Sequence, residues 1–412
     1  MNAEILAVGT ELLMGQIANT NAQYLSRRLA DLGIKVYYHS VVGDNPGRLK
    51  ESLKLALDRS DIVITTGGLG PTQDDLTKET IAEAMGKKLV LNQESYERIK
   101  HFFERLNRKM ADNNAKQAYL PEGSTVIPNP NGTAPGCIIA SEGKTIIMLP
   151  GPPKEMIPMF EGTVFPYFET KTGQVIASRM LKVFGIGESE MEMRIIDLIQ
   201  GQANPTIAPY VGLGEVIIRV TAGCRNRCEA EELLEPVIQR IRERLGDFVY
   251  ATNGENMEDV VVKLLLDRKS TLSTAESCTG GLLASKLVSV PGVSQVFNRG
   301  FVTYSNEAKI EELGVSPETL EQYGAVSPET AEEMVRGLAK RAGTNAAISV
   351  TGVAGPDGGT AEKPVGLVYV SAILDGRVET RKLNLIGDRE RIRNVSCLNA
   401  LDLLRRMLLG IA

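Results

Sequence analysis

The stretch AESCTGG, at residues 275–281, holds the kinds of side chain from which a nucleophilic site is built: hydroxyls, a thiol, a carboxylate and two glycines. A hydroxyl or thiol attacks a carbonyl carbon efficiently only when a neighbouring base takes its proton. The chain has two histidines, His39 and His101, and both lie far upstream of this stretch. Unless another domain or subunit supplies a histidine, the base must be a lysine, a tyrosine or an oriented serine.

Several later segments offer such groups beside expected strand ends and turns. RGFVTYSNEAK (299–309) carries Tyr304 and Lys309, and a lysine becomes a base when burial or nearby charge lowers its pKa. The other candidates are Ser294 in SVPGVSQVF, Thr351 in the glycine-rich SVTGVAGPDGG, and Arg389 in GDRERIR. Each also has a plain structural interpretation as a cap, a strand residue or a solvated charge. Their concentration beside three glycine-rich turns favours a site.

A second chemical signal lies near the start, in TTGGLGPTQDDLTKET (65–80), which follows an apolar strand-like run. Glycines after a strand let backbone N–H groups approach a phosphate closely, and a following helix adds a favourable dipole. The adjacent Asp74 and Asp75 suit Mg²⁺ or Mn²⁺, which bind oxygen ligands and substrate phosphates. The alternative is a strand-to-helix turn with an aspartate cap.

Two more carboxylates follow strand-like runs in the same region. Glu11 comes after EILAVG (4–9), and Asp44 comes after KVYYHSVV (35–42). Because ligands of doubly wound sheets collect at the carboxyl ends of strands, we expect Glu11, Asp44 and Asp74 to converge. Lys154, in the rigid turn LPGPPKEM, is available for a phosphate.

The pattern of strand-like and helix-like segments predicts an α/β fold in three parts. Residues 1–170 alternate strand-like and helix-like patterns, which predicts parallel βαβ units. Residues 171–252 read as a small α+β module with a loop at 201–214, and residues 253–412 read as a second α/β unit. In the last part SPETL (316–320) and SPETA (327–331) predict helix starts, with serine caps and proline in the first turn.

Composition excludes several classes of function. The net charge is −5 without a lysine- or arginine-rich tract, so nucleic-acid binding is not expected. No apolar run reaches the roughly 18 residues that span a membrane, and the start lacks the layout of a signal peptide, so we expect a cytoplasmic protein without membrane association. The spacing of Cys224 and Cys228 does not fit a zinc site, and the scattered cysteines indicate reduced thiols.

The motifs GTELLMGQIANTN, TTGGLGPTQDD, NPNGTAPG and LPGPPKEM resemble those of the CinA family (competence/damage-inducible protein A), and the likeness covers essentially the whole chain. The first domain is similar to molybdopterin-binding domains of the MoaB and MogA type. In this family it is associated with metal-dependent ADP-ribose pyrophosphatase activity, which implies Mg, Mn or Co as cofactor. The implied metal ligands are Asp74, Asp75, Glu11 and Asp44, and the implied phosphate-binding residues are Gly67, Gly68, Gly70, Thr72 and Lys154.

The motifs AESCTGG, RGFVTYSNEAK, YGAVSPET, TGVAGPDGG, KPVG and GDR are similar to the stand-alone nicotinamide-nucleotide amidohydrolases called PncC. That resemblance implies metal-free hydrolysis of nicotinamide mononucleotide (NMN) to nicotinic acid mononucleotide and ammonia. It implies Ser294 as nucleophile, Lys309 with Tyr304 as base, and Thr351 orienting the amide or stabilising the oxyanion. Ser277 is the rival nucleophile and Cys278 the third choice. Arg389 and the loops with Gly280, Gly281, Gly355 and Gly358 would hold the 5′-phosphate.

We therefore expect a bifunctional enzyme of pyridine-nucleotide salvage whose substrates are NMN and ADP-ribose, and by resemblance a homodimer. The alternative is a nucleotide- or pterin-binding regulatory protein with an inactive first domain. A role as a DNA recombination accessory would follow from the family name alone, and the net negative charge argues against DNA binding.

Overall fold

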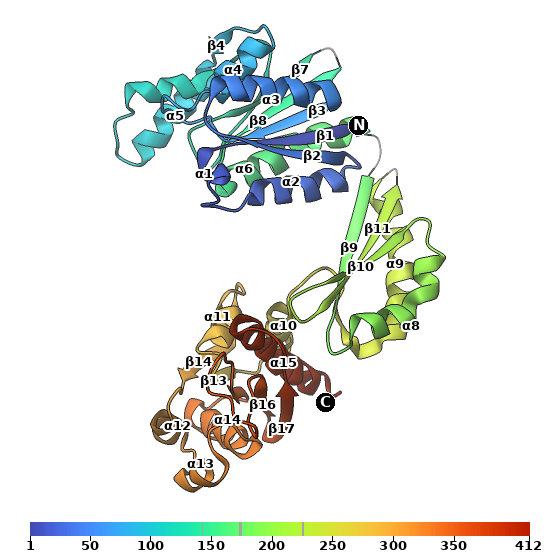
Figure 1. The fold of residues 1–412 in the computed structure, drawn as a ribbon, viewed down its shortest axis with the longest axis vertical. Coiled ribbons are helices and arrows are strands. Elements are labelled where there is room, and N and C mark those ends of the chain that lie inside the picture. The colour runs from blue at the N-terminus through green and yellow to red at the C-terminus, as the bar shows by residue number, and fades with distance from the viewer. Residues whose placement is uncertain (142, 173–174, 225) are drawn as a thin grey trace. The chain divides into compact units, whose positions relative to one another are not determined.

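The computed structural model describes residues 1–141, 143–172, 175–224 and 226–412. The chain divides into two compact units (Figure 1), one of residues 1–177 with 222–232 and one of residues 178–221 with 233–412. Among the described residues, no helix is both long and apolar enough to cross a membrane. The α/β class predicted from the sequence is confirmed.

The first 172 residues alternate strands and helices as predicted. The elements are β1 (Asn2–Val8), α1 (Thr10–Leu13), α2 (Thr20–Asp31), β2 (Lys35–Val42), α3 (Pro46–Arg59), β3 (Ile62–Thr66), α4 (Thr77–Ala84), β4 (Leu89–Leu91), α5 (Gln93–Arg105), the 3₁₀ helix η1 (Asp112–Ala118), β5 (Tyr119–Pro121), β6 (Thr125–Ile127), β7 (Gly136–Ser141), β8 (Lys144–Leu149), α6 (Pro153–Met159), the π-helix η2 (Phe160–Val164) and α7 (Phe165–Thr172).

Six of these strands form one sheet in the order β2-β1-β3-β8-β7-β6. Strands β2, β1, β3 and β8 are parallel, whereas β7 and β6 are antiparallel additions. Alternate side chains of β1 enter different hydrophobic clusters: Ile5 packs with residues of α2 and α6, and Leu6 with residues of α3 and α4. Helices therefore cover both faces, and the carboxyl ends of β1, β2 and β3 open at one edge.

The middle segment forms a four-stranded sheet in the order β10-β11-β9-β12. Its elements are β9 (Val175–Val183), α8 (Glu188–Gln200), β10 (Thr206–Val211), β11 (Val216–Cys224), α9 (Arg227–Leu245), the 3₁₀ helix η3 (Gly246–Phe248) and β12 (Val249–Ala251). The loop predicted at 201–214 is wrong in part, because it contains β10. This strand pairs antiparallel with β11, so a long-range partner satisfies backbone groups that local turn composition could not assign.

The last segment contains a five-stranded sheet in the order β14-β13-β15-β16-β17. Its elements are α10 (Met257–Arg268), β13 (Leu272–Glu276), α11 (Leu282–Val288), the 3₁₀ helix η4 (Val293–Gln295), β14 (Phe297–Val302), α12 (Asn306–Leu313), α13 (Pro317–Tyr323), α14 (Pro328–Ala342), β15 (Ala346–Gly352), β16 (Leu367–Leu374), β17 (Arg377–Asn384) and α15 (Arg389–Leu409). Strands β14, β13 and β15 are parallel.

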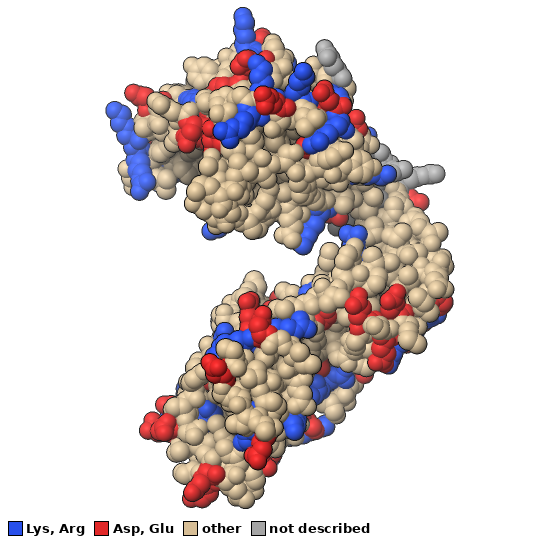
Figure 2. Space-filling view, in the orientation of Figure 1, with Lys and Arg blue, Asp and Glu red and all other residues tan. Residues whose placement is uncertain are grey.

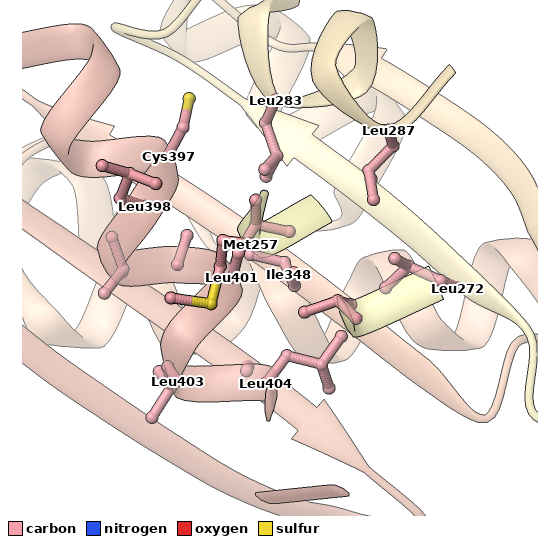
Figure 3. Close-up of a cluster of buried hydrophobic side chains, with 14 of the residues drawn as sticks. Met257, Leu272, Leu283, Leu287, Ile348, Cys397, Leu398, Leu401, Leu403 and Leu404 are labelled. Carbon is pink, nitrogen blue, oxygen red and sulfur yellow. The ribbon is translucent and has the colours of Figure 1, made fainter. Parts of the chain in front are cut away.

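Both faces of this sheet are buried. Leucines of α11 and α15 meet Leu272 of β13 and Ile348 of β15 in one cluster (Figure 3). Residues of α14 pack with Ala275 and Ala347 in a second cluster. Because helices cover both faces of the central strands, polar side chains of this segment can reach a ligand only beyond the ends of these strands.

The two SPET segments begin helices as predicted. Ser316 accepts hydrogen bonds from the N–H groups of Glu318 and Thr319 at the start of α13, and Ser327 accepts one from Thr330 at the start of α14. Proline occupies the first helical position in both cases. These caps fix where α13 and α14 start, and thus how the chain returns from β14 to β15.

Candidate functional site

The site of the last segment lies where β13 and β14 end. Glu276, the last residue of β13, is the register partner of Val302, the last residue of β14. Ser277 and Thr303 follow these two residues, so parallel pairing brings the AESCTGG turn beside the segment that leads into α12. The two segments meet at the carboxyl ends of parallel strands, which is where doubly wound sheets bind their ligands.

Lys309 of α12 points back into this edge and contacts Ser277. Its Nζ donates to Thr303 O at 2.8 Å and lies 3.2 Å from Ser277 Oγ. The side chain is fully buried, and desolvation lowers its pKa to about 8, although Cys278 and Glu307 oppose that shift. Burial disfavours the ammonium form, so the neutral amine needed for proton abstraction is accessible near physiological pH.

Glu276 holds the turn that carries Ser277. Its carboxylate is buried and accepts hydrogen bonds from the backbone N–H groups of Gly281, Leu283 and Ala284, at 2.8–3.0 Å. Gly281 has φ +90, a left-handed conformation that glycine adopts without strain. The carboxylate of Glu276 therefore caps the first turn of α11. The position of Ser277, the next residue, depends on these hydrogen bonds.

Cys278 is poorly suited to be a nucleophile. Its thiol is buried, and desolvation raises its pKa to about 11, with partial opposition from a backbone hydrogen bond and from Arg389 and Arg393. The thiolate is the nucleophilic form of cysteine, and it is scarce at neutral pH here.

The structure does not bring Ser294 to Lys309. Ser294 is exposed in η4, three residues before Phe297, which pairs with Leu272 at the start of β13. Ser277 follows the other end of the same strand. Five residues of parallel strand span roughly 16 Å, so within one chain the two serines lie beyond opposite ends of β13. The reason is the crossover through α11, which returns the chain to the amino-terminal end of β13 before the parallel strand β14 begins.

Two other predicted roles also differ from the observed contacts. The hydroxyl of Tyr304 lies 3.4 Å from Arg389 Nη2, and it is the backbone carbonyl of Tyr304 that contacts Lys309 Nζ, at 3.4 Å. Thr351 is fully buried and donates its hydroxyl hydrogen to Ala325 O at 2.6 Å. Neither hydroxyl contacts the lysine amine: Thr351 is held by Ala325 O from within β15, and Tyr304 lies beyond the end of β14 with its hydroxyl beside Arg389.

Two arginines at the start of α15 flank the turn. Arg389 Nη1 donates to Gly355 O at 2.5 Å, which joins the glycine loop to the neighbourhood of Tyr304. Arg393 Nη2 donates to Thr279 O at 2.6 Å and lies close to Gly280. Gly358 follows in the same glycine loop with φ +84. Sequence reasoning did not select Arg393, although its spacing of four residues from Arg389 on one helix was the available signal.

The first unit has a separate candidate site, a cavity of about 430 Å³ at the ends of β1, β2 and β3. Glu11, Asp44, Asp74 and Asp75 all line it, together with Gly67, Gly68 and Gly70. Gly67 has φ +102, and a Cβ there would lie 2.1 Å from the carbonyl oxygen of Val8, so only glycine fits. Thr72 and Lys154 are absent from the described residues that line this cavity.

Local hydrogen bonds orient these carboxylates. Asp44 Oδ2 accepts from Thr10 N at 3.0 Å and from Thr10 Oγ1 at 2.9 Å. Asp75 Oδ2 accepts from both the N–H and the hydroxyl of Thr72. The pKa of Asp74 is lowered, first by the hydroxyl of Thr72 and then by a backbone hydrogen bond.

The described residues do not include three or more His, Cys, Asp or Glu side chains grouped closely enough to enclose a metal ion. Mg²⁺ commonly binds through one or two carboxylates and completes its shell with water and substrate phosphate. Carboxylates that line one cavity with a glycine cradle fit that mode of binding, in which the phosphate ligand supplies the remaining oxygens.

Fold and site define a multidomain α/β protein with a buried Ser–Lys contact in one unit and an acidic, glycine-lined cavity in the other. Three family models match the chain: "Probable molybdopterin binding domain" over residues 4–170, "Damage-inducible protein CinA KH domain" over 178–251 and "CinA C-terminal domain" over 254–408. The match of the first model confirms the predicted likeness to molybdopterin-binding domains.

Full-length relatives identify the family. A protein of Acetivibrio thermocellus named as a competence-damage inducible protein is 61% identical over 98% of this chain and 98% of its own. A CinA-like protein of Dictyoglomus turgidum is 57% identical over 100% of both chains. The crystal structure of competence/damage inducible protein CihA from Agrobacterium tumefaciens covers 38% of this chain and 96% of its own, with 40% identity and a TM-score of 0.35. The chain belongs to the CinA family.

Proposed function

We propose that the last segment is an amidohydrolase that converts NMN to nicotinic acid mononucleotide and ammonia. The observation that carries this proposal is the contact between Lys309 Nζ and Ser277 Oγ at 3.2 Å, with the lysine fully buried and its pKa lowered to about 8. A hydroxyl in contact with a desolvated amine is the arrangement that nucleophilic catalysis without histidine requires. The substrate assignment comes from the family resemblance of the motifs around this pair.

In the proposed reaction Ser277 Oγ attacks the carboxamide carbon and its proton passes to Lys309 Nζ. The ammonium of Lys309 then protonates the departing nitrogen, so ammonia leaves and an acyl ester remains on Ser277. Water, deprotonated by the same amine, attacks the ester, and the returning proton restores the serine hydroxyl. The net reaction consumes one water and releases one carboxylic acid and one ammonia.

Arg389 and Arg393 are the proposed partners of the 5′-phosphate. Both guanidinium groups lie at the glycine turns, against Gly355 O and Thr279 O respectively. Arginine matches phosphate geometry through paired N–H groups. A phosphate bound there would fix one end of the nucleotide while the amide reaches Ser277.

The test is product formation from NMN by full-length protein in the presence of a metal chelator. Nicotinic acid mononucleotide and ammonia in equal amounts are expected, with chromatography and an ammonia assay as readouts. Folded protein that forms neither product would reject the amidohydrolase and favour a binding role for this segment.

We propose further that the acidic cavity of the first unit hydrolyses ADP-ribose to AMP and ribose 5-phosphate. The supporting observation is that Glu11, Asp44, Asp74 and Asp75 share one cavity with the glycines that follow β3. A divalent metal bound by these carboxylates would neutralise diphosphate charge as water attacks phosphorus and the bridging P–O bond breaks. The chain's own contribution is the glycine cradle, which lets backbone N–H groups approach the diphosphate.

Hydrolysis of ADP-ribose measured with Mg²⁺, Mn²⁺ and Co²⁺ tests this second activity. We expect turnover with at least one metal and a loss of about a hundredfold or more in Asp74→Asn. Absence of turnover with all three metals would instead support a nucleotide- or pterin-binding first domain.

A further inference from the structure

The first unit contains a second cavity, of about 540 Å³, which the proposed chemistry does not use. It lies between α5 and the segment 126–135, which contains all but the last residue of the rigid turn NPNGTAPG (129–136). Cavities of about 300–1,000 Å³ are typical of small-molecule sites, so its size suits a nucleotide. The residues that line it and carry the argument are Arg98, Arg105, Phe102, Glu94 and Thr133.

The α5 wall of this cavity is cationic and aromatic. Arg98 and Arg105 are seven residues apart, so they lie on one face of the helix two turns apart. Both are exposed, and neither forms an ion pair with any residue that the structure describes. Phe102 lies between them, with the Arg105 guanidinium 5.8 Å from its ring centroid. Among the described side chains that line this cavity, Glu94 is the one carboxylate, and there are two arginines.

This cavity adjoins the acidic one. Thr133 lines both cavities. The turn that separates them is tied to the acidic side, because Asn129 Nδ2 donates to Glu155 Oε2 at 2.6 Å and Glu155 lines the acidic cavity. A ligand with its diphosphate among the carboxylates can therefore extend across the turn at Thr133 and enter the cavity beside α5.

We propose that the cavity beside α5 binds the nucleoside end of the substrate hydrolysed in the acidic cavity. This inference rests on the proposed diphosphate hydrolysis and assigns the part of the substrate that the carboxylates do not contact. Phe102 and the guanidinium plane of Arg105 provide stacking surfaces for a base, and the two arginines can donate hydrogen bonds to the ribose hydroxyls and the ring nitrogens of the nucleoside. The site thereby selects nucleoside diphosphate sugars over diphosphates that lack a nucleoside.

The experiment compares two substrates in full-length protein with the supporting metal. ADP-ribose carries the nucleoside, whereas ribose 5-diphosphate has a phosphoanhydride without one. For the double variant Arg98→Gln/Arg105→Gln we expect KM for ADP-ribose to rise about tenfold or more, with kcat little changed, and the kinetics with ribose 5-diphosphate to stay as in the wild type. Lys100→Gln, an exposed lysine of α5 outside the cavity lining, is the matched control and should leave both substrates unaffected.

Equal effects of the double variant on both substrates, or no effect on either, would overturn the inference while the hydrolase stands. Retained NMN hydrolysis and an unchanged Tm show that the variant is folded. If the wild type hydrolyses neither diphosphate, the proposed activity itself fails, and calorimetric titration with AMP then tests the cavity directly. AMP binding that weakens in the double variant would support the site, and wild-type protein that does not bind AMP would reject it.

Discussion

In the part of the chain that the structure describes, the amine of Lys309 forms no ion pair with a carboxylate. The hydrogen bonds of its Nζ among the described residues go to the hydroxyl of Ser277 and to backbone carbonyls of residues 303–305. Burying an ammonium with neutral acceptors alone costs free energy, and a purely structural role would be filled better by an apolar side chain. A fold that retains such a lysine beside a serine favours a chemical role.

We predict that Lys309→Met lowers kcat for NMN by about 10²- to 10⁴-fold, because the general base is lost. Methionine has similar length and removes a costly buried charge, so Tm should stay the same or rise. Steady-state kinetics and thermal melts measure both quantities. Lys382→Met, at an exposed position on β17, is the control and should behave as wild type. Activity near wild type in Lys309→Met would remove this residue from the mechanism.

The two serines can be separated by a paired substitution. Ser277→Ala should lower kcat at least about a thousandfold, because the nucleophile is removed. Ser294→Ala, at the exposed position beyond the other end of β13, should leave kcat within about threefold. The opposite pattern would mean that Ser294 reaches the amine from a second copy of the chain, and a mixture of Ser294→Ala with Lys309→Met would then recover activity.

The pH dependence follows from the lowered pKa of Lys309, about 8. The base acts in its neutral form, so kcat/KM for NMN should rise with pH and level off above about 8. The thiol of Cys278, with its pKa raised to about 11, should not add a limb below that value. Initial rates from about pH 6 to about pH 10 provide the measurement. A profile that is flat across pH 8 would exclude this amine as the base.

At the scale of elements, the turn between β13 and α11 is the least replaceable part of the proposed amidohydrolase site. Glu276 accepts hydrogen bonds from three backbone N–H groups there. Without this carboxylate, those N–H groups would lose their hydrogen-bond acceptor. The register of β13 with β14 then determines that Ser277 meets the segment leading to Lys309. Site geometry therefore depends on a strand pairing and on one buried carboxylate.

We predict that Glu276→Gln lowers the free energy of unfolding by about 2 kcal/mol, because an amide cannot replace all three accepted hydrogen bonds. It should also lower kcat more than it raises KM, since Ser277 moves relative to Lys309. Denaturant unfolding and NMN kinetics test this together. Glu311→Gln, at an exposed position on α12, is the matched control. Unchanged stability in Glu276→Gln would show that the turn is held by other contacts.

Charge at the scale of the whole molecule agrees with small-molecule substrates. Lys and Arg side chains are interspersed with Asp and Glu on the face drawn in Figure 2, without an extended basic area. The formal charge of −5 points the same way. Binding to nucleic acid depends on a concentrated positive surface, and the sequence provides no tract for one.

The two proposed activities should differ in their response to metal removal. A chelator is expected to abolish ADP-ribose hydrolysis, because the carboxylate cavity depends on a divalent ion, and to leave NMN hydrolysis unchanged. Both substrates are assayed on one preparation, with metal restored as the reversal control. Loss of NMN hydrolysis on chelation, recovered with metal, would contradict the lysine-based mechanism.

The sequence by itself determined most of the elements and the residues that line the acidic cavity. Alternating apolar runs predicted the βαβ units, the SPET segments marked helix starts, and carboxylates after strands pointed to one acidic cavity, because these signals are local or follow from parallel pairing. Tertiary structure alone decided which hydroxyl meets the amine. The family resemblance implied Ser294 as nucleophile with Ser277 as its rival, but the crossover through α11 places the two serines at opposite ends of β13. Desolvation of Lys309 and the position of Arg393 likewise arise only when α12 and α15 pack against that sheet edge.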